Sequence, residues 1–307
     1  MASHIFRQAT ASASRPPLLL LNGWTLTRSQ WGSLLPAHNP SSWYGRTVIA
    51  LDNRGVGDGE PVRDDTPLTL ESLAEDAVAA LDALECETAH VLGLSMGGMI
   101  AQLVAARHPE RVASLVLCAT TGGGRQLSVP AERSFARQFF GTFRGVQDGD
   151  DAAQIAAATA FWRSGLAADD PQQRDASAAR DAARAFVDAG PRTAAGTAAQ
   201  LAALSSGGRD VFMGEGVAAP PTLIVHGTHD RVLPFENAQR LHAHLGSEVA
   251  RLLVLEGHGH LVNYSHTHLG VAVARFLNSV DAGEGAGREG EEWGAWNHSR
   301  GQSSASR

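Results

Sequence analysis

Short, uninterrupted apolar runs recur along this chain of 307 residues, and stretches with helical spacing separate them. Strands that are buried on both faces read as continuous apolar runs, whereas strands with one solvated face alternate apolar and polar residues. Alternation of buried strands with helices therefore predicts an α/β fold with a mostly parallel, doubly wound sheet. We interpret six runs as strands: residues 18–21, 47–51, 90–92, 112–118, 222–225 and 252–255.

Helices are predicted where apolar residues recur at spacings of three and four. Beside the strands they cover residues 29–35, 69–84, 99–107 and 271–280. Between residues 122 and 214 the strand pattern stops, and Ala-rich sequence predicts helices near 131–143, 152–163, 172–187 and 193–204. We interpret this stretch as a helical cap inserted between two strands. Its aromatic residues, among them Phe139, Phe140, Phe161 and Trp162, are expected to hold the cap together or to line a pocket beneath it.

The predicted body therefore has two parts, residues 1–121 and 215–280, with the cap at 122–214 and a disordered tail at 281–307. The tail is rich in Gly, Ser, Glu and Arg and has almost no aliphatic residues, so it has little apolar surface to bury. We expect its removal from Asp281 onward to leave folding unchanged. The first 15 residues lack acidic side chains, as transit segments do, but we favour an ordinary N-terminal segment.

Composition narrows the possible partners and the compartment. The net charge of −7 is modest and unclustered, which argues against nucleic acid and anionic membranes as partners. No apolar run is long enough to span a bilayer. Cys86 and Cys118 form neither a disulfide framework nor a metal cluster, and we expect reduced thiols in the cytoplasm. Monomer and homodimer both remain open.

The segment Gly93-Leu94-Ser95-Met96-Gly97 lies between a predicted strand and a predicted helix. Strand, sharp turn and helix form the context of a nucleophile elbow, in which a serine side chain is held outward at the end of a strand. The two glycines allow a tight turn and a close approach of strand and helix. The N–H of Met96 would lie at the helix N-terminus, where developing negative charge is stabilised. The alternative is a Gly-Ser turn without a catalytic role.

A serine hydroxyl needs a base to accept its proton, and that base is usually a histidine oriented by an acid. The segment His226-Gly227-Thr228-His229-Asp230 follows the strand at 222–225, and Gly257-His258-Gly259-His260 follows the strand at 252–255. The carboxyl ends of parallel strands meet at one edge of the sheet, so these segments should lie near the elbow. The chain thus supplies a serine, an acid and a histidine in that order.

These segments, together with Asn22-Gly23-Trp24 and Asp52-Asn53-Arg54-Gly55-Val56-Gly57, resemble the α/β-hydrolase fold family over residues 18–280. Within that family, the stretch that begins at Gly93 is most similar to enol-lactonases and small methyl esterases. The resemblance implies a catalytic triad of Ser95, Asp230 and His260. It also implies an oxyanion hole formed by the backbone N–H groups of Trp24 and Met96.

The chain departs from the family pattern at Asn22, where a histidine usually precedes the glycine. The resemblance assigns Asp52 and Arg54 to a loop with a structural role, so both stay outside the catalytic set. His258 and His260 are separated by one glycine, and the family pattern matches His260. Gly259 gives the backbone freedom just before a side chain that must turn inward, which also favours His260. His258 is then expected to face the cap or solvent.

Other chemistries are less well supported. The pairs His242-x-His244, His258-x-His260 and His266-x-His268 have the spacing of metal ligands, but no carboxylate or cysteine cluster accompanies them. We therefore expect no metal and no other cofactor. A cysteine or an aspartate at the elbow would have indicated other hydrolase chemistries, but the elbow carries a serine.

The sequence thus predicts a cofactor-free serine hydrolase that cleaves a small or medium apolar ester or lactone through an acyl-enzyme. A carbon–carbon bond hydrolase and a thioesterase are alternatives that the same triad can support. A ligand receptor with slow turnover, built on the same fold, is an alternative of a different class.

Overall fold

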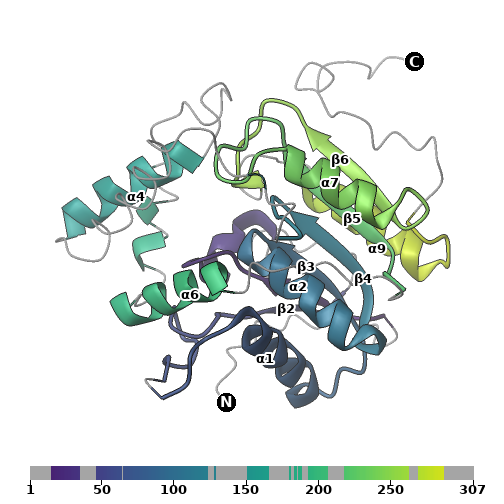
Figure 1. The fold of residues 1–307 in the computed structure, drawn as a ribbon, viewed down its shortest axis with the longest axis horizontal. Coiled ribbons are helices and arrows are strands. Elements are labelled where there is room, and N and C mark those ends of the chain that lie inside the picture. The colour runs from purple at the N-terminus through teal and green to yellow at the C-terminus, as the bar shows by residue number, and fades with distance from the viewer. Residues whose placement is uncertain are drawn as a thin grey trace.

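The computed structural model describes residues 15–34, 46–63, 65–123, 128, 151–165, 180, 183–184, 186–188, 193–206, 218–262 and 269–286. Within these residues six strands form one parallel sheet in the order β2-β1-β3-β4-β5-β6 (Figure 1). The strands are β1 (Leu18–Leu21), β2 (Val48–Ala50), β3 (Ala89–Leu94), β4 (Val112–Cys118), β5 (Thr222–Gly227) and β6 (Ala250–Leu255). The predicted α/β fold with a mostly parallel sheet is confirmed.

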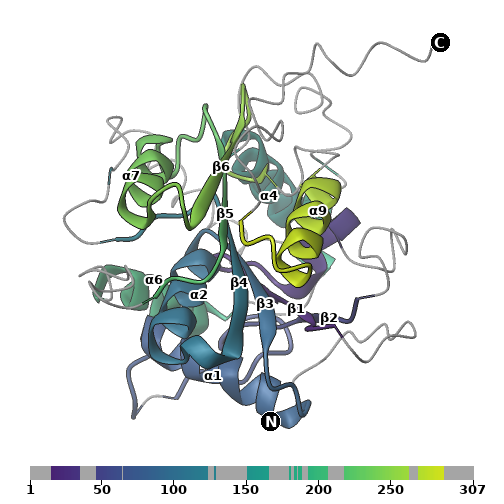
Figure 2. The same ribbon diagram turned by 90° about the vertical axis from the view of Figure 1, so that its right-hand side faces the viewer.

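Helices cover both faces of the sheet (Figure 2). The α-helices are α1 (Leu70–Ala83), α2 (Met96–Arg107), α4 (Asp151–Gly165), α6 (Ala194–Ser206), α7 (Glu236–Leu245) and α9 (Leu269–Asp281). Two 3-10 helices, η1 (Arg28–Leu34) and η2 (Pro109–Arg111), complete the described elements. The chain before α1 is fixed by a capping box, in which the Thr69 hydroxyl accepts from the Ser72 N–H and the Ser72 hydroxyl accepts from the Thr69 N–H.

The apolar runs of the strands feed two separate cores, one on each face of the sheet. Leu18 and Leu20 pack in the core that contains the buried side of α9, whereas Leu19 and Leu21 pack in the core beneath α1, α2 and α7. All four leucine side chains are buried. Successive side chains of a strand point to opposite faces, so a strand between two helical layers must be apolar at every position.

Beside β1, the side of the sheet on which successive strands are added reverses. The chain passes from β1 outward to β2 and then returns to form β3 on the other side of β1. Ligand sites of open parallel sheets lie at such a switch point, in the crevice beyond the carboxyl ends of the two strands. Leu21 of β1 is paired with Gly93 of β3, so the loop that begins at Asn22 and the elbow at Ser95 start side by side.

Helix α7 was not predicted from the sequence. Its only strongly apolar buried residue is Leu241, and the rest of its buried face is made by Asn237 and Ala238. The Asn237 side-chain N–H donates to the carbonyl oxygens of Pro234 and Ser128. Polar side chains therefore complete the contacts of α7, and a search for apolar periodicity alone passes over it.

Between β4 and β5 the structure describes two long helices, α4 and α6, which lie apart from the helices that flank the sheet (Figure 1). They correspond to the helices predicted at 152–163 and 193–204. The helix predicted at 131–143 lies outside the described residues, as do the side chains of Phe139, Phe140, Phe161 and Trp162. Phe186 is buried in the core that contains α9. The limits of the cap stay a prediction.

The C-terminal limit of the body lies beyond residue 280, where the sequence analysis had set it. Helix α9 includes Asp281, and Ala286 is buried in the same core as α9. The Asp281 carboxylate accepts from Arg46 Nη2 at 2.5 Å, and its other oxygen lies 3.1 Å from His90 Nε2. Because Arg46 and His90 are both buried, these contacts argue against removing Asp281 together with the tail.

The same cluster fixes the tautomer of His90. The carboxylate of Asp281 can only accept, so His90 Nε2 carries a proton and donates it. His90 Nδ1 then accepts from the hydroxyl of Ser114 at 2.7 Å. Burial, reinforced by the positive charge of Arg46, lowers the pKa of His90 to about 4, although Asp281 opposes that shift. His90 is therefore neutral at neutral pH.

The first prediction concerns the C-terminal limit. A chain that ends at residue 286 should unfold with the free energy of the full chain. A chain that ends at residue 280 should lose about 3 kcal/mol, because Arg46 then stays buried without its carboxylate. Urea denaturation followed by circular dichroism measures both. The Asp281→Asn variant of the full chain separates the ion pair from the lost residues. Equal stability of all four proteins would remove this role for Asp281.

The second prediction concerns pH. Between its ordinary pKa of 6.5 and its folded value of about 4, His90 binds a proton in the unfolded chain but not in the folded one. The free energy of unfolding should therefore fall as pH drops through this window, by about 3 kcal/mol in total for this one group. The His90→Gln variant retains a donor at the Nε2 position and cannot titrate. Urea denaturation at several pH values should show a flatter dependence for this variant. Parallel curves would contradict the assignment.

Candidate active site

Ser95 occupies the sharp turn between β3 and α2. Its backbone angles are φ 55° and ψ −118°, a conformation that costs energy for a residue with a side chain. The surrounding backbone fixes this conformation, because the Ser95 N–H donates to the Cys118 carbonyl at 2.9 Å and the Ser95 carbonyl accepts from the Thr120 hydroxyl at 2.7 Å. The turn is thus tied to the end of β4.

Two glycines make the turn sterically possible. A Cβ atom at Gly93 would lie 2.2 Å from the Gly97 carbonyl oxygen, and one at Gly97 would lie 2.0 Å from the Leu21 carbonyl oxygen. No real side chain tolerates such distances. Glycine is therefore required at both positions because backbones approach closely there, within the turn at Gly93 and against β1 at Gly97.

The structure brings Ser95, Asp230 and His260 together. His260 Nε2 lies 3.0 Å from the Ser95 hydroxyl oxygen, and His260 Nδ1 lies 2.8 Å from Asp230 Oδ2. The carboxylate can only accept, so Nδ1 carries the proton and Nε2 is left with a lone pair directed at the serine hydroxyl. Both Asp230 and His260 are buried. The arrangement can remove a proton from Ser95 and hold it on His260.

The Asp230 carboxylate is surrounded by donors. Its Oδ1 accepts from the backbone N–H groups of Val232 and Leu233, both at 2.8 Å. Its Oδ2 faces His260 and a second histidine, His226, at 3.1 Å. Burial alone would raise the pKa of Asp230. The positive charge of protonated His260 and the hydrogen bonds from both histidines outweigh burial and hold that pKa below its usual range.

His226 is the residue of this site that the sequence analysis missed. Its side chain is fully buried, and its Nε2 lies 2.8 Å from the Leu233 carbonyl oxygen as well as 3.1 Å from Asp230 Oδ2. Both oxygens accept, so the proton of neutral His226 is on Nε2. Its Nδ1 has no hydrogen-bond partner among the described residues. The sequence feature that could have indicated its role is its position at the end of β5, four residues before Asp230.

The two residues expected to supply the oxyanion hole lie in the elbow and in the loop after β1. Met96 is the first residue of α2, where the backbone N–H groups of a helix lack intrahelical partners. Trp24 follows Gly23, and a Cβ atom at Gly23 would lie 3.3 Å from Ser95 Cβ. The loop after β1 therefore lies directly against the serine. An anion beside Ser95 would face a helix N-terminus on one side and this loop on the other.

Comparisons with known proteins agree with this geometry. The family model described as alpha/beta hydrolase fold matches residues 16–267. The chain is 30% identical over 251 residues to a 2-hydroxy-6-oxononadienedioate/2-hydroxy-6-oxononatrienedioate hydrolase of Paraburkholderia xenovorans, and the match covers 81% of this chain and 82% of that one. The chain belongs to the α/β-hydrolase fold family. It is a hydrolase of that family.

Two further matches extend the range of relatives. A pimeloyl-[acyl-carrier protein] methyl ester esterase of Aromatoleum aromaticum is 31% identical over 258 residues, which cover 82% of this chain and 94% of that one. Other proteins named pimeloyl-[acyl-carrier protein] methyl ester esterase match over a shorter stretch. In the one from Neisseria meningitidis, the match covers 35% of that protein. The solved enol-lactonase from Burkholderia xenovorans LB400 has a TM-score of 0.67 at 21% identity, covering 91% of this chain and 96% of that one. At that identity the likeness concerns the fold.

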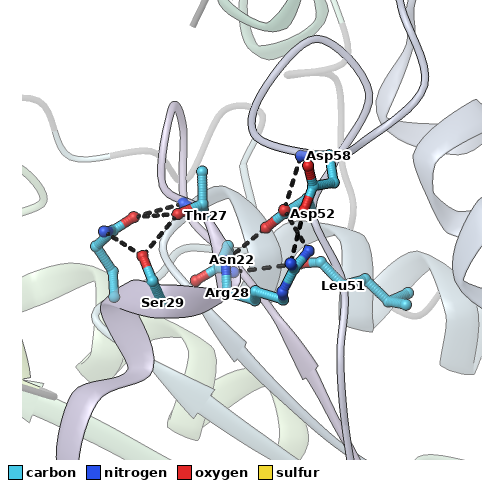
Figure 3. A network of polar contacts seen from close by, with 8 residues as sticks. Asn22, Thr27, Arg28, Ser29, Leu51, Asp52 and Asp58 are labelled. Atoms are coloured by element: carbon cyan, nitrogen blue, oxygen red, sulfur yellow. Dashed lines mark hydrogen bonds and ion pairs between the residues drawn. The ribbon is translucent and has the colours of Figure 1, made fainter. Parts of the chain in front are cut away.

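Asp52, which the α/β-hydrolase resemblance had assigned to a structural loop, fixes the far end of the loop after β1. Its Oδ1 accepts from the Arg28 N–H at 2.6 Å, and its Oδ2 accepts from Arg28 Nη1 at 2.9 Å and from the Asp58 N–H at 3.0 Å (Figure 3). At the near end, the Asn22 side chain donates to the Leu51 carbonyl at 3.3 Å. Asn22 thus ties the ends of β1 and β2 together.

His258 does not face solvent, which was one of the two surroundings expected for it. It is buried, with an exposed fraction of 2%, and its Nδ1 donates to the Glu256 carbonyl at 2.9 Å. Its own carbonyl accepts from the His229 N–H at 2.9 Å. The segment before His260 is packed against Gly227, so both histidines point inward and only His260 contacts Ser95. Among the described residues, no three His, Cys, Asp or Glu side chains are placed to hold a metal ion.

The third prediction separates the two histidines. His260→Ala should lower kcat/KM by a factor of about 10³ or more, because it removes the base that contacts Ser95. His258→Asn should retain most of the rate, since an asparagine amide can still donate to the Glu256 carbonyl. Steady-state kinetics on one ester, with thermal unfolding as a check on folding, measures both. The reverse ranking in folded proteins would assign the base to His258.

Proposed function

We propose that the protein hydrolyses a small or medium apolar ester or lactone through an acyl-enzyme on Ser95. The observation that carries the proposal is the pair of distances at His260, 3.0 Å to the serine hydroxyl and 2.8 Å to Asp230. A serine in a nucleophile elbow, a base in contact with it and an acid that fixes the base are the parts that acyl transfer requires.

The chemistry follows from these positions. The Ser95 hydroxyl oxygen attacks the carbonyl carbon while its proton passes to His260 Nε2. The carbonyl oxygen becomes an oxyanion, which the N–H groups of Met96 and Trp24 bind. When the carbon–oxygen bond to the alcohol breaks, protonated His260 gives its proton to the departing oxygen. Water then attacks the acyl-enzyme with His260 as base, which releases the acid and restores Ser95.

Asp230 maintains the order of these proton transfers. It stays ionised because four donors surround it, so it stabilises the imidazolium of His260 without taking the proton. His260 must be neutral before the attack, because its Nε2 has to accept the serine proton.

The substrate class rests on the relatives and on the surroundings of the site. A methyl ester esterase aligns with 82% of this chain. Partly exposed apolar side chains lie on the loops that carry the site, Trp24 after β1 and Val232 after β5, and Val187 of the inserted region packs on the same core. Apolar side chains beside the site would favour an uncharged, largely apolar acyl or alcohol group.

A second candidate is hydrolysis of a carbon–carbon bond. The Paraburkholderia relative named as a hydrolase of 2-hydroxy-6-oxononadienedioate is similar over 81% of this chain and favours this alternative. Thioester hydrolysis and a slow receptor role use the same serine. The four possibilities differ in the substrate turned over and in whether turnover continues after the first acylation.

The fourth prediction tests the proposal. A fluorophosphonate should label Ser95, and Ser95→Ala should abolish labelling and lower the rate by a factor of about 10³ or more. The substrate panel contains p-nitrophenyl esters of increasing chain length, lactones, a thioester and a vinylogous diketone. Activity should be highest on an ester or a lactone. An alanine variant with the rate of the wild type would overturn the mechanism. A single product burst without turnover would favour a receptor, and preference for the diketone would favour carbon–carbon hydrolysis.

A further inference from the structure

Helix α6 of the inserted region is attached to the loop that carries Trp24. Gln200 is fully buried, and its Oε1 accepts from the backbone N–H of Thr25 at 3.0 Å. One turn earlier, the Thr197 carbonyl accepts from Trp24 Nε1 at 3.1 Å. Residues three apart lie on the same face of a helix, so one face of α6 holds two consecutive residues of the loop.

Gln200 also connects α6 to a second loop. Its Nε2 donates to the Arg54 carbonyl at 2.8 Å. Nearby, α6 and this loop meet backbone to backbone, because a Cβ atom at Gly196 would lie 2.2 Å from the Gly55 carbonyl oxygen. The amide of Gln200 thus bridges the loops that follow β1 and β2. The close contact between Gly196 and Gly55 fixes where α6 packs on these loops.

The loop needs this support because its backbone is strained. Thr25 has a φ of 65°, in the left-handed region that β-branched residues rarely adopt. Such a conformation persists where the surroundings over-determine it. The N–H of Thr25, held by Gln200, is one residue from the N–H of Trp24. The other expected oxyanion donor, Met96, is the first residue of α2 and directly follows Ser95 in the elbow.

We propose that Gln200 is a positioning residue for the oxyanion hole, and that the hole is complete only while α6 is seated on the loops after β1 and β2. The proposal rests on the proposed function, since it requires Trp24 to bind the oxyanion. One donor of the hole then depends on the body alone, and the other depends on the inserted region as well. A substrate that lifts α6 loses the Trp24 donor, so specificity is exerted on the transition state as well as on binding.

The test uses Gln200→Met, which is close in size and cannot form either hydrogen bond of the amide. The expected result is a fall in kcat of about 10-fold to 100-fold with KM within about twofold, because a misplaced donor weakens the transition state more than the bound ester. The affinity for a trifluoromethyl ketone, which forms a tetrahedral oxyanion adduct with the serine, should fall by the same factor as kcat/KM. Ala198→Met places the same side chain on the exposed face of α6 and should change neither value.

A second variant keeps the test decisive if Gln200→Met unfolds. Gly196→Ala introduces a Cβ against the Gly55 carbonyl and must displace α6, while alanine favours the helix itself. It should reproduce the fall in kcat and in affinity for the ketone. Wild-type kcat in both folded variants would overturn the proposal, as would a lower kcat with unchanged ketone affinity. Failure of the proposed function gives a different result, because Ser95→Ala would then retain both the rate and the labelling by the fluorophosphonate.

Discussion

The fold and the candidate site both depend on one steric constraint, the meeting of β1, β3 and α2 around Ser95. The left-handed backbone of the serine can exist only because glycines at 93 and 97 let three main chains approach each other. The strand order puts this meeting at the switch point of the sheet. The position of the serine hydroxyl and the start of α2 beside it therefore arise from the same local packing, and a change at either glycine would alter both.

Around this rigid turn, electrostatics sets the chemical character of the site. A carboxylate in the interior is costly unless donors replace the water it has lost. Asp230 receives two backbone N–H groups and two imidazoles, so it is held as an anion with a fixed orientation. At the other end of the sheet, His90 is buried next to a cation and is held neutral. His260 and His90 are each paired with an aspartate but have opposite tasks: His260 accepts a proton, and His90 stays neutral.

Local patterns predicted the parts of the structure that local physics determines. Uninterrupted apolar runs located the six described strands, and strand-end motifs together with the family resemblance indicated Ser95, Asp230 and His260. Helix α7 was not predicted because an asparagine forms part of its buried face. The contacts of Asp281 with Arg46 and of Gln200 with Thr25 join residues 235 and 175 positions apart, and each partner has an ordinary polar side chain. No spacing in a single sequence distinguishes such residues from solvated ones.

The ion pair of Asp281 has a consequence for how the protein is made. Arg46 lies between β1 and β2 and is among the first parts of the body to be synthesised, whereas Asp281 comes after every strand of the sheet. Domains fold largely as units while the ribosome delivers them from the N-terminus. Throughout synthesis, a nascent chain therefore carries a guanidinium and an imidazole whose partner does not yet exist. The ion pair can therefore form only after α9 has been synthesised.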